Sequence, residues 1–166
     1  MALATWACSS APKSPDVAPA IRQSLTAAGY KDISVSQDRD KGVVTLKGHV
    51  ADDNARQRAA AIASSLAQGQ VVANEVALVT PGAEHASDEM NSDLDKGIEK
   101  NLDAALISAS LNKQIQYSVK NGVITLTGSV NSPALRDQAA RIAASVPYQR
   151  QVVNEVQIKD QKATSD

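Results

Sequence analysis

Few side chains in this sequence are suited to acid–base catalysis or metal binding: two histidines, His49 and His85, and one cysteine, Cys8. A catalytic base or a metal site needs neighbours held at fixed geometry, and no local pattern supplies them here. His49 takes an outward position in an alternating stretch, and His85 lies in a segment without periodicity. No glycine-rich phosphate loop follows an expected strand, and no Gly-x-Ser-x-Gly nucleophile motif occurs. We therefore expect a protein that is not an enzyme and has no metal or cofactor.

Two Asn-Glu pairs, Asn74-Glu75 and Asn154-Glu155, are the most regular polar feature. One interpretation makes the two glutamates a paired site. The other makes them outward-pointing side chains, because the neighbouring valines take the inward positions of a strand. We favour the second interpretation, and we expect Asn74 and Asn154 to satisfy backbone groups near the edge of a sheet.

Composition narrows the function classes. The 166 residues include 17 Lys and Arg and 18 Asp and Glu, for a net charge of −1, which argues against a nucleic-acid binder. Phe is absent and there is one Trp, so base-stacking platforms are not expected either. The single cysteine excludes an intrachain disulfide. No apolar run reaches the ~18 residues expected of a transmembrane helix, so we expect no membrane span.

The first residues, Met1–Ala7, are apolar and lead to Cys8. This stretch resembles the end of a bacterial lipoprotein signal, in which a small residue precedes the cysteine that becomes lipid-modified. The alternative is an incidental cysteine near a chain end. Ser9–Pro15 is polar and contains proline, which predicts a disordered tether, so we assign residues 1–15 to a signal remnant and tether.

An internal repeat organises the rest of the chain. Residues 42–78 and 122–158 align without a gap at an offset of 80, with 16 identities over 37 positions. The repeated glycines are expected to be structural: the first of each copy at a turn, and the second where a helix approaches the sheet closely. They are Gly42, Gly48, Gly122 and Gly128. The repeated Arg56 and Arg136 are expected to form surface ion pairs.

Apolar periodicity predicts the same order of elements in each copy: helix, strand, strand, helix, strand. In the first copy, Asp16 is expected to cap a helix that ends near Ala28. The helix of the second copy is expected to open at Ser92 or Asp93, with one apolar stripe formed by Leu94, Ile98, Leu102, Ala105 and Leu106. The first two strands form an antiparallel hairpin, and the last strand follows a right-handed parallel crossover.

The predicted fold class is therefore α+β, with two repeated domains that each have a three-stranded mixed sheet and two helices on one face. The domains are expected at residues 16–80 and 93–159, with a linker at 81–92 and a polar tail at 160–166. Domains of this size leave much of their surface exposed to water and are only marginally stable alone. We therefore expect the two domains to pack on each other or on a partner.

The repeated strand Gly-Val-[Val/Ile]-Thr-Leu-x-Gly-x-Val, the alanine-rich helix and the strand Val-x-Asn-Glu-Val resemble the BON domain, a bacterial domain named for osmotically inducible and nodulation proteins. The resemblance implies a periplasmic protein, or an outer-membrane lipoprotein, without catalysis. Tandem-BON relatives include lipoproteins that bind anionic phospholipid and a soluble osmotic-stress protein with chaperone-like behaviour.

The resemblance also points to lipid-contact candidates, because in lipid-binding relatives the first helix of the second domain meets the membrane. Here that helix carries Lys96 and Lys100, with Lys113 just beyond it. Each basic residue near an anionic surface contributes about 1 kcal/mol of binding. Acidic residues on the same helix offset this attraction: Asp93, Asp95, Glu99 and Asp103.

Two functions follow as hypotheses. The first is peripheral association with the cell envelope through phospholipid or an envelope partner, in envelope integrity or osmotic stress. The second is a soluble periplasmic stress chaperone for unfolded or outer-membrane proteins. A basic cluster with a lipidated Cys8 would favour the first function, and an exposed apolar patch would favour the second.

Overall fold

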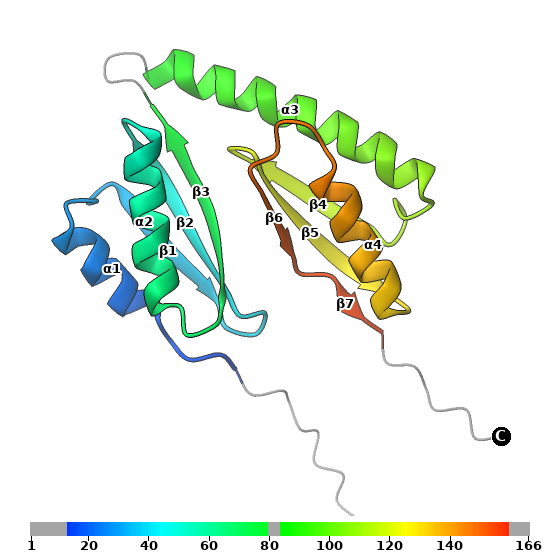
Figure 1. Ribbon diagram of the computed structural model, residues 1–166, viewed down its shortest axis with the longest axis horizontal. Coiled ribbons are helices and arrows are strands. Elements are labelled where there is room, and N and C mark those ends of the chain that lie inside the picture. Colours follow the sequence, from blue (N-terminus) through cyan, green and yellow to red (C-terminus); the bar gives the residue numbers. More distant parts are fainter. Residues whose placement is uncertain (1–12, 80–83, 160–166) are drawn as a thin grey trace, which may run out of the picture.

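The computed structural model describes residues 13–79 and 84–159, which form two α+β units joined in tandem (Figure 1). In the first unit the elements are α1 (Ala18–Ala27), β1 (Ile33–Asp38), β2 (Val43–Val50), α2 (Asp53–Leu66) and β3 (Val71–Leu78). In the second unit they are α3 (Glu84–Ser108), β4 (Ile115–Lys120), β5 (Val123–Val130), α4 (Pro133–Ala144), β6 (Gln151–Asn154) and β7 (Gln157–Ile158).

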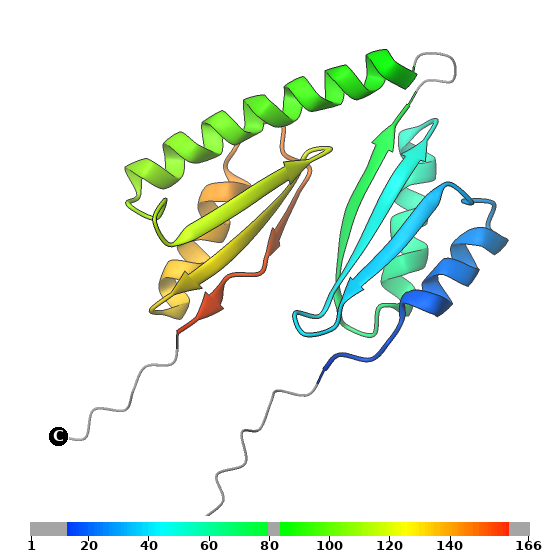
Figure 2. The ribbon, with the colours of Figure 1, turned by 180° about the vertical axis from the view of Figure 1, so that it is seen from behind.

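Both sheets have the predicted mixed topology. In the first sheet, with order β1-β2-β3, β1 pairs antiparallel with β2, and β2 pairs parallel with β3. In the second sheet, β4 pairs antiparallel with β5, whose other side pairs parallel with β6 and then β7. The two views of the ribbon show α1 and α2 together on one face of the first sheet (Figures 1 and 2). The α+β prediction is confirmed.

Each unit has its own apolar core between its helices and its sheet. The first helix of each unit buries three apolar residues at spacings of four: Val17, Ile21 and Leu25 in α1, and Ile98, Leu102 and Leu106 in α3. The second helix buries alanines, including Ala59 and Ala139, which are both 0% exposed. Because alanine is small, α2 and α4 lie close against their sheets.

The start of α1 differs from the prediction. Asp16 does not cap the helix, since Val17 occupies the N-cap position without a side-chain cap. Instead, the Gln37 side-chain oxygen accepts hydrogen bonds from the backbone N–H groups of Val17 (3.1 Å) and Ala18 (3.2 Å). The Gln37 side chain from β1 therefore satisfies the backbone N–H groups at the start of α1, a role that was expected of Asp16.

The last residues of the expected tether are held by the fold. The Ser14 N–H donates to the Arg39 carbonyl (2.9 Å), and the Arg39 guanidinium donates to the Ser14 carbonyl (2.7 Å). The Gln37 amide also donates to the Pro15 carbonyl (2.7 Å). The expectation of disorder is thus wrong for Lys13–Pro15, while Cys8 and the other tether residues lie outside the described residues.

Helix α3 is longer than predicted. It begins at Glu84 rather than at Ser92 or Asp93, so most of the expected linker 81–92 is helical. The segment from Glu84 to Asn91 contains good helix formers, and acidic residues near a helix N-terminus interact favourably with its dipole. The early part of α3 extends beyond the core of its own unit, so Leu94, expected on the buried stripe, is 47% exposed.

The glycines at the ends of the second strands are required for a different reason from the one predicted. A Cβ at Gly48 would lie 2.1 Å from the backbone oxygen of Asp32, and a Cβ at Gly128 would lie 2.2 Å from that of Gln114. Both have positive φ angles, +133° and +111°. The close neighbour is thus the backbone that enters the first strand, and not a helix.

The other repeated glycines lie in turns, as expected. Gly122 has φ +77° and follows Asn121 at φ +49°, a pair of positive values that suits a tight β-hairpin. Gly42 has φ +67° before β2.

The final strand of the second unit is divided, where one strand was predicted. Strand β6 ends at Asn154, whose side-chain oxygen accepts from the Val156 N–H at 3.1 Å, and β7 begins at Gln157. The two pieces keep one register, because Val123 faces Gln151 and Ser129 faces Gln157. The Glu155 N–H still donates to the Leu126 carbonyl (2.8 Å) across the interruption. The divided strand therefore follows the same path as β3 in the first unit.

The two units pack on each other through the sheet faces that their helices leave uncovered, as predicted. Four apolar side chains form this contact, all at most 5% exposed: Val43, Ala73, Val123 and Val153. Val43 has the outward orientation that alternation predicts, but it is buried because the second unit covers it. The Lys41 ammonium also reaches the Glu155 carboxylate at 2.5 Å across the junction.

One glutamine side chain covers the free edge of β3. The Gln151 amide donates to the Val72 carbonyl (2.7 Å), and its oxygen accepts from the Asn74 N–H (3.0 Å). These are the two bonds that a residue of a neighbouring parallel strand would make. The Asn121 amide adds a bond to the Glu75 carbonyl (2.6 Å). The exposed backbone of an edge strand is thereby satisfied by the other unit.

Gly48→Ala should lower the free energy of unfolding by roughly 2–4 kcal/mol, because the new methyl group meets backbone at a positive φ angle. Gly97→Ala is the matched control, since Gly97 lies in α3 with nothing within 4 Å of its Cβ position. That control should raise stability by up to about 1 kcal/mol. Urea denaturation measures both, and equal stability of the two variants would contradict the assignment.

Gln151→Ala should lower the free energy of unfolding by about 1–3 kcal/mol, because it leaves the Val72 carbonyl and the Asn74 N–H without their partner. Hydrogen exchange at the Asn74 amide should accelerate in this variant. Gln157→Ala, at an exposed position of β7, is the control and should leave that amide unchanged. If the Asn74 backbone amide exchanges at an unaltered rate in the Gln151→Ala variant, the Gln151 side chain does not close the edge of β3.

Candidate functional site

The histidines and the cysteine do not come together. His49 is exposed on β2, His85 falls in the first turn of α3, and Cys8 lies outside the described residues. Within residues 13–79 and 84–159, no group of three His, Cys, Asp or Glu side chains is placed to hold a metal ion. In the same residues, no helix combines the length and apolar character needed to cross a bilayer.

The repeated asparagines have equivalent contacts in the two units. The Asn74 amide donates to the Arg56 carbonyl (3.3 Å), and its oxygen accepts from the Val76 N–H (3.4 Å). The Asn154 amide likewise donates to the Arg136 carbonyl (3.2 Å). Each asparagine therefore ties the last strand of its unit to the start of the helix before it.

The repeated glutamates form separate ion pairs. Glu75 lies 3.6 Å from Lys47 of its own unit, and Glu155 pairs with Lys41 of the other unit. Their side chains are only 14% and 11% exposed, because the outward faces of the sheets are covered by the junction. The hydrogen bond that Lys41 donates to the Glu155 carboxylate raises the pKa of Lys41 above its ordinary value of 10.5. These contacts give each glutamate a structural role.

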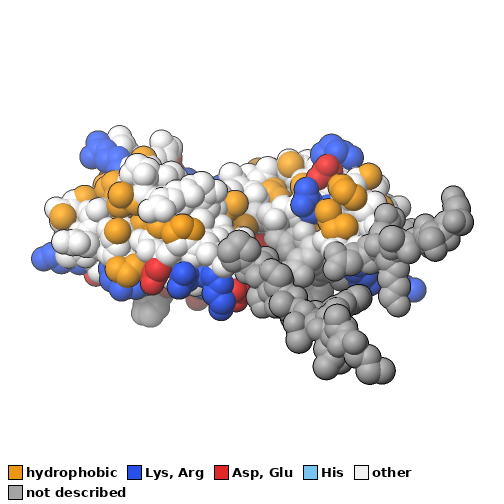
Figure 3. Space-filling view, turned by 90° about the horizontal axis from the view of Figure 1, so that it is seen from below, with side chains coloured by type: hydrophobic (Ala, Val, Ile, Leu, Met, Phe, Trp, Pro, Cys, Tyr) orange, Lys and Arg blue, Asp and Glu red, His pale blue; other side chains and the backbone are white. Residues whose placement is uncertain are grey.

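The lysine candidates on α3 are placed beside acids. Lys96 lies 3.0 Å from the Asp93 carboxylate on the exposed side of α3. Lys100 and Lys113 are exposed and form no ion pair with the residues that the structure describes. Seen from below, Lys and Arg side chains occupy several separate places among apolar and uncharged groups (Figure 3). The charge of α3 and of this face is mixed in sign.

Two more acidic residues of α3 act on a tyrosine. Tyr117 on β4 has a raised pKa, first because it is partly buried, and then because the Asp103 carboxylate places a negative charge beside its hydroxyl and accepts its hydrogen bond. Glu99 adds a further negative charge nearby. Asp103 and Glu99 therefore add negative charge to the side of α3 that faces β4.

Asp95, expected among the exposed acids, is instead buried, with 7% exposure. Its carboxylate accepts from the backbone N–H groups of Asn121 (2.7 Å) and Gly122 (2.8 Å). It therefore fixes the turn between β4 and β5 to α3. The sequence offered no local signal for this contact, because the partners are distant in the chain.

An apolar groove lies at the N-terminal half of α3, and the sequence analysis missed it. Met90 is 67% exposed and Leu94 47% exposed, and with Leu78 of β3 they line a cavity of about 410 Å³. Tyr148, 81% exposed, lies on the far side of Leu94. A signal was present, since Met90 and Leu94 are four residues apart and share a helical face once α3 is extended. We call Leu78, Met90 and Leu94 the apolar groove.

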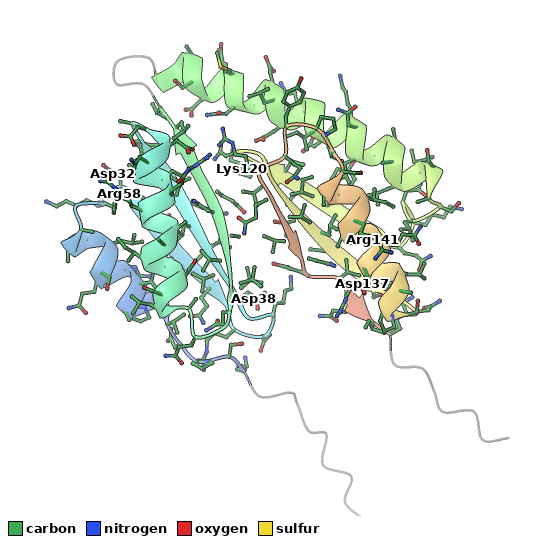
Figure 4. The ribbon with its side chains drawn as sticks, viewed as in Figure 1. Asp32, Asp38, Arg58, Lys120, Asp137 and Arg141 are labelled. Carbon is green, nitrogen blue, oxygen red and sulfur yellow. The ribbon has the colours of Figure 1, made fainter. Side chains whose placement is uncertain are left out.

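Two polar cavities lie at the junction of the units. One, of about 250 Å³, is lined by His49 and by charged side chains of both signs: Lys47, Glu75, Asp88 and Lys120. Lys120 lies at the turn between β4 and β5, which faces the first unit (Figure 4). The other cavity, of about 330 Å³, includes Arg56 of α2 and Arg150 from the segment before β6.

Taken together, the described residues form two small α+β units in tandem, with cavities at their junction. The chain belongs to the BON domain family, whose model matches residues 15–80 and 94–160. BON domain proteins are associated with the cell envelope, and family membership favours a binding module over an enzyme.

Among solved structures, the chain is similar to CdsD, a structural protein of the type III secretion system of Chlamydia trachomatis. A structure of the CdsD C-terminal domain is 18% identical with a TM-score of 0.36, and covers 86% of this chain and 67% of that one. A second CdsD structure is 17% identical with a TM-score of 0.36, covering 85% and 63%. No curated protein matches the sequence.

The Tyr117 hydroxyl should ionise above pH 10, and the folded protein should lose stability as the pH rises through this raised pKa. Asp103→Asn should lower the pKa of Tyr117 only in part, because burial remains. Phenolate absorbance, compared with a Tyr117→Phe variant, measures the change. Asp93→Asn is the control and should have no effect, and an equal shift in both variants would refute the Asp103 contact.

Proposed function

We propose that this protein is a non-enzymatic binding module of the cell envelope that holds apolar segments of envelope protein partners in the apolar groove. The single observation that carries the proposal is the exposure of Met90 and Leu94 side by side on α3. Apolar side chains gathered in a concave surface favour binding of another apolar surface. Unfolded or outer-membrane proteins present such segments before they fold.

The position of the groove supports this role. Leu78 belongs to the first unit and the other two groove residues to the second, so a bound segment would contact both units. Burying exposed apolar area contributes roughly 25 cal/mol per Å². Weak and broad recognition is expected from such a surface, and methionine suits it because its side chain adapts to differently shaped partners.

We place the protein in the periplasm, where unfolded outer-membrane proteins are met. Ala7 before Cys8 supports anchoring at the outer membrane through a lipidated cysteine, whereas Thr5 and Trp6 depart from the lipoprotein pattern and favour the soluble form. Neither a soluble periplasmic protein nor a lipid-anchored one requires a catalytic residue, a cofactor or nucleic acid for this role.

Anionic phospholipid is the second candidate ligand, through Lys96, Lys100 and Lys113. The observation in its favour is Ile107, which is 52% exposed and lies two turns after Lys100 on the same helical face. An apolar side chain beside lysines is typical of a peripheral membrane contact. Asp93 lies on that face too, and its pairing with Lys96 makes this candidate the weaker one.

A double variant, Met90→Ser with Leu94→Ser, tests the first candidate. It should weaken binding of a chemically unfolded outer-membrane barrel protein by roughly tenfold or more, because two apolar contacts are lost. The fold should be retained, since both side chains are exposed. Light scattering of the aggregating client and fluorescence anisotropy of a labelled client measure the loss.

Lys96→Glu with Lys100→Glu, on the outward face of the same helix, is the matched variant. It should leave client binding unchanged. If instead the protein sediments with anionic vesicles at low salt, and this charge reversal alone abolishes sedimentation, phospholipid is the ligand and the groove is not the site.

A further inference from the structure

The cavity between α2 and the start of β6 has the character of a polar binding site. Its volume is about 330 Å³, and both units contribute to it. Polar side chains on its walls include Gln57 and Ser64 of α2, and apolar walls come from Val72 and Val123. Arg150 lines both this cavity and the cavity of the apolar groove, whereas Leu78, Met90 and Leu94 line only the latter of the two.

Two guanidinium groups line this cavity, one from each unit. Arg56 projects from the first turn of α2, and its side chain is only 15% exposed. The Arg150 side chain lies across the turn at Gly122. A Cβ atom added at Gly122 would lie 3.0 Å from the Cγ atom of Arg150. The pKa of Arg150 is lowered, first by burial and then by the positive charge of Arg56. The fold thus holds two like charges close enough to repel each other.

Each guanidinium retains hydrogen-bond donors for a ligand. A guanidinium has five N–H groups. In the described part of the chain, Arg56 pairs with Asp53, and Arg150 donates to the Asn121 carbonyl at 3.3 Å. The nearby carboxylates are Asp53 and Asp95, and Asp95 already accepts two backbone N–H bonds. A ligand must therefore compete only with Asp53.

We propose that Arg56 and Arg150 form a phosphate-binding site between the two units. Guanidinium groups match phosphate oxygens in pairs. A tetrahedral phosphate presents acceptors in several planes, so it can accept from two forks that arrive from different units, whereas a planar carboxylate cannot do so as well. The remaining volume, with Gln57 and Ser64 on its wall, admits the polar body of a phosphorylated small molecule or a headgroup.

Binding at this site would connect the units. Because Arg56 and Arg150 belong to different units, a bound phosphate removes their mutual repulsion and holds the junction closed. This proposal does not depend on client binding in the apolar groove, whose residues do not include Arg56.

Titration of the whole chain with inorganic phosphate, at constant ionic strength kept with sodium chloride, tests the site. Amide NMR should show saturable shifts confined to the cavity, including Gln57 and Gln151. Arg56→Gln should raise the dissociation constant roughly tenfold or more. Arg150→Gln, changed in the other unit, should have a comparable effect, which separates loss of the site from damage to one unit.

Arg58→Gln is the matched control. Arg58 belongs to the same helix but is exposed and lies away from the second unit (Figure 4). The control should bind phosphate like the unchanged protein. Equal weakening in the Arg56 and Arg58 variants, or shifts scattered over surface lysines without saturation, would overturn the proposal.

A vesicle arm identifies the source of the phosphate. If phosphatidylglycerol vesicles sediment the unchanged protein but not the Arg56→Gln variant, the site takes a lipid headgroup. If vesicle binding is absent or equal in both, the site takes a soluble phosphorylated compound. The Met90→Ser and Leu94→Ser variant should bind phosphate normally in either case, so failure of the groove and failure of this site are distinguishable.

Discussion

The contact between the uncovered faces of the two sheets is the interaction on which the rest of the structure depends. Helices cover only one face of each sheet, so the outward valines of a lone unit would face water. Packing Val43 and Ala73 against Val123 and Val153 removes these apolar side chains from water, which is energetically favourable. The same contact brings the two units together, and the cavities and the groove lie at this junction.

The two copies of the repeat have diverged where they meet. Gln151 covers the edge of β3, whereas the equivalent residue of the first unit, Val71, is 47% exposed. Helix α3 is far longer than α1, and its added turns carry Met90 beside the first unit. The shared residues keep each fold, and the unshared residues make the junction asymmetric. The candidate sites depend on unshared residues such as Met90, Leu94 and Arg150, although the repeated Arg56 lines one of them.

This division explains what the sequence could predict. Alternation of inward and outward residues and the repeat itself can be read directly from the sequence. They were sufficient to predict the strands, their pairing and the two domains. Asp16 failed as a cap because Gln37, distant in sequence, takes that role. Leu94 was expected to be buried because the helix was assumed to start near it. The Arg56–Arg150 cavity could not be found, since neither residue has a pattern that links it to the other.

The single glutamine that closes the edge of β3 has a consequence for assembly. If the units separate, β3 and β6 both become free edges, and the second unit of one molecule can close the first unit of another. The same contacts can form between the two units of one chain or between units of two chains. The short connection favours the contact within one chain, because it keeps those two units near each other. Low protein concentration favours the closed monomer, and a higher concentration shifts the balance towards domain-swapped chains.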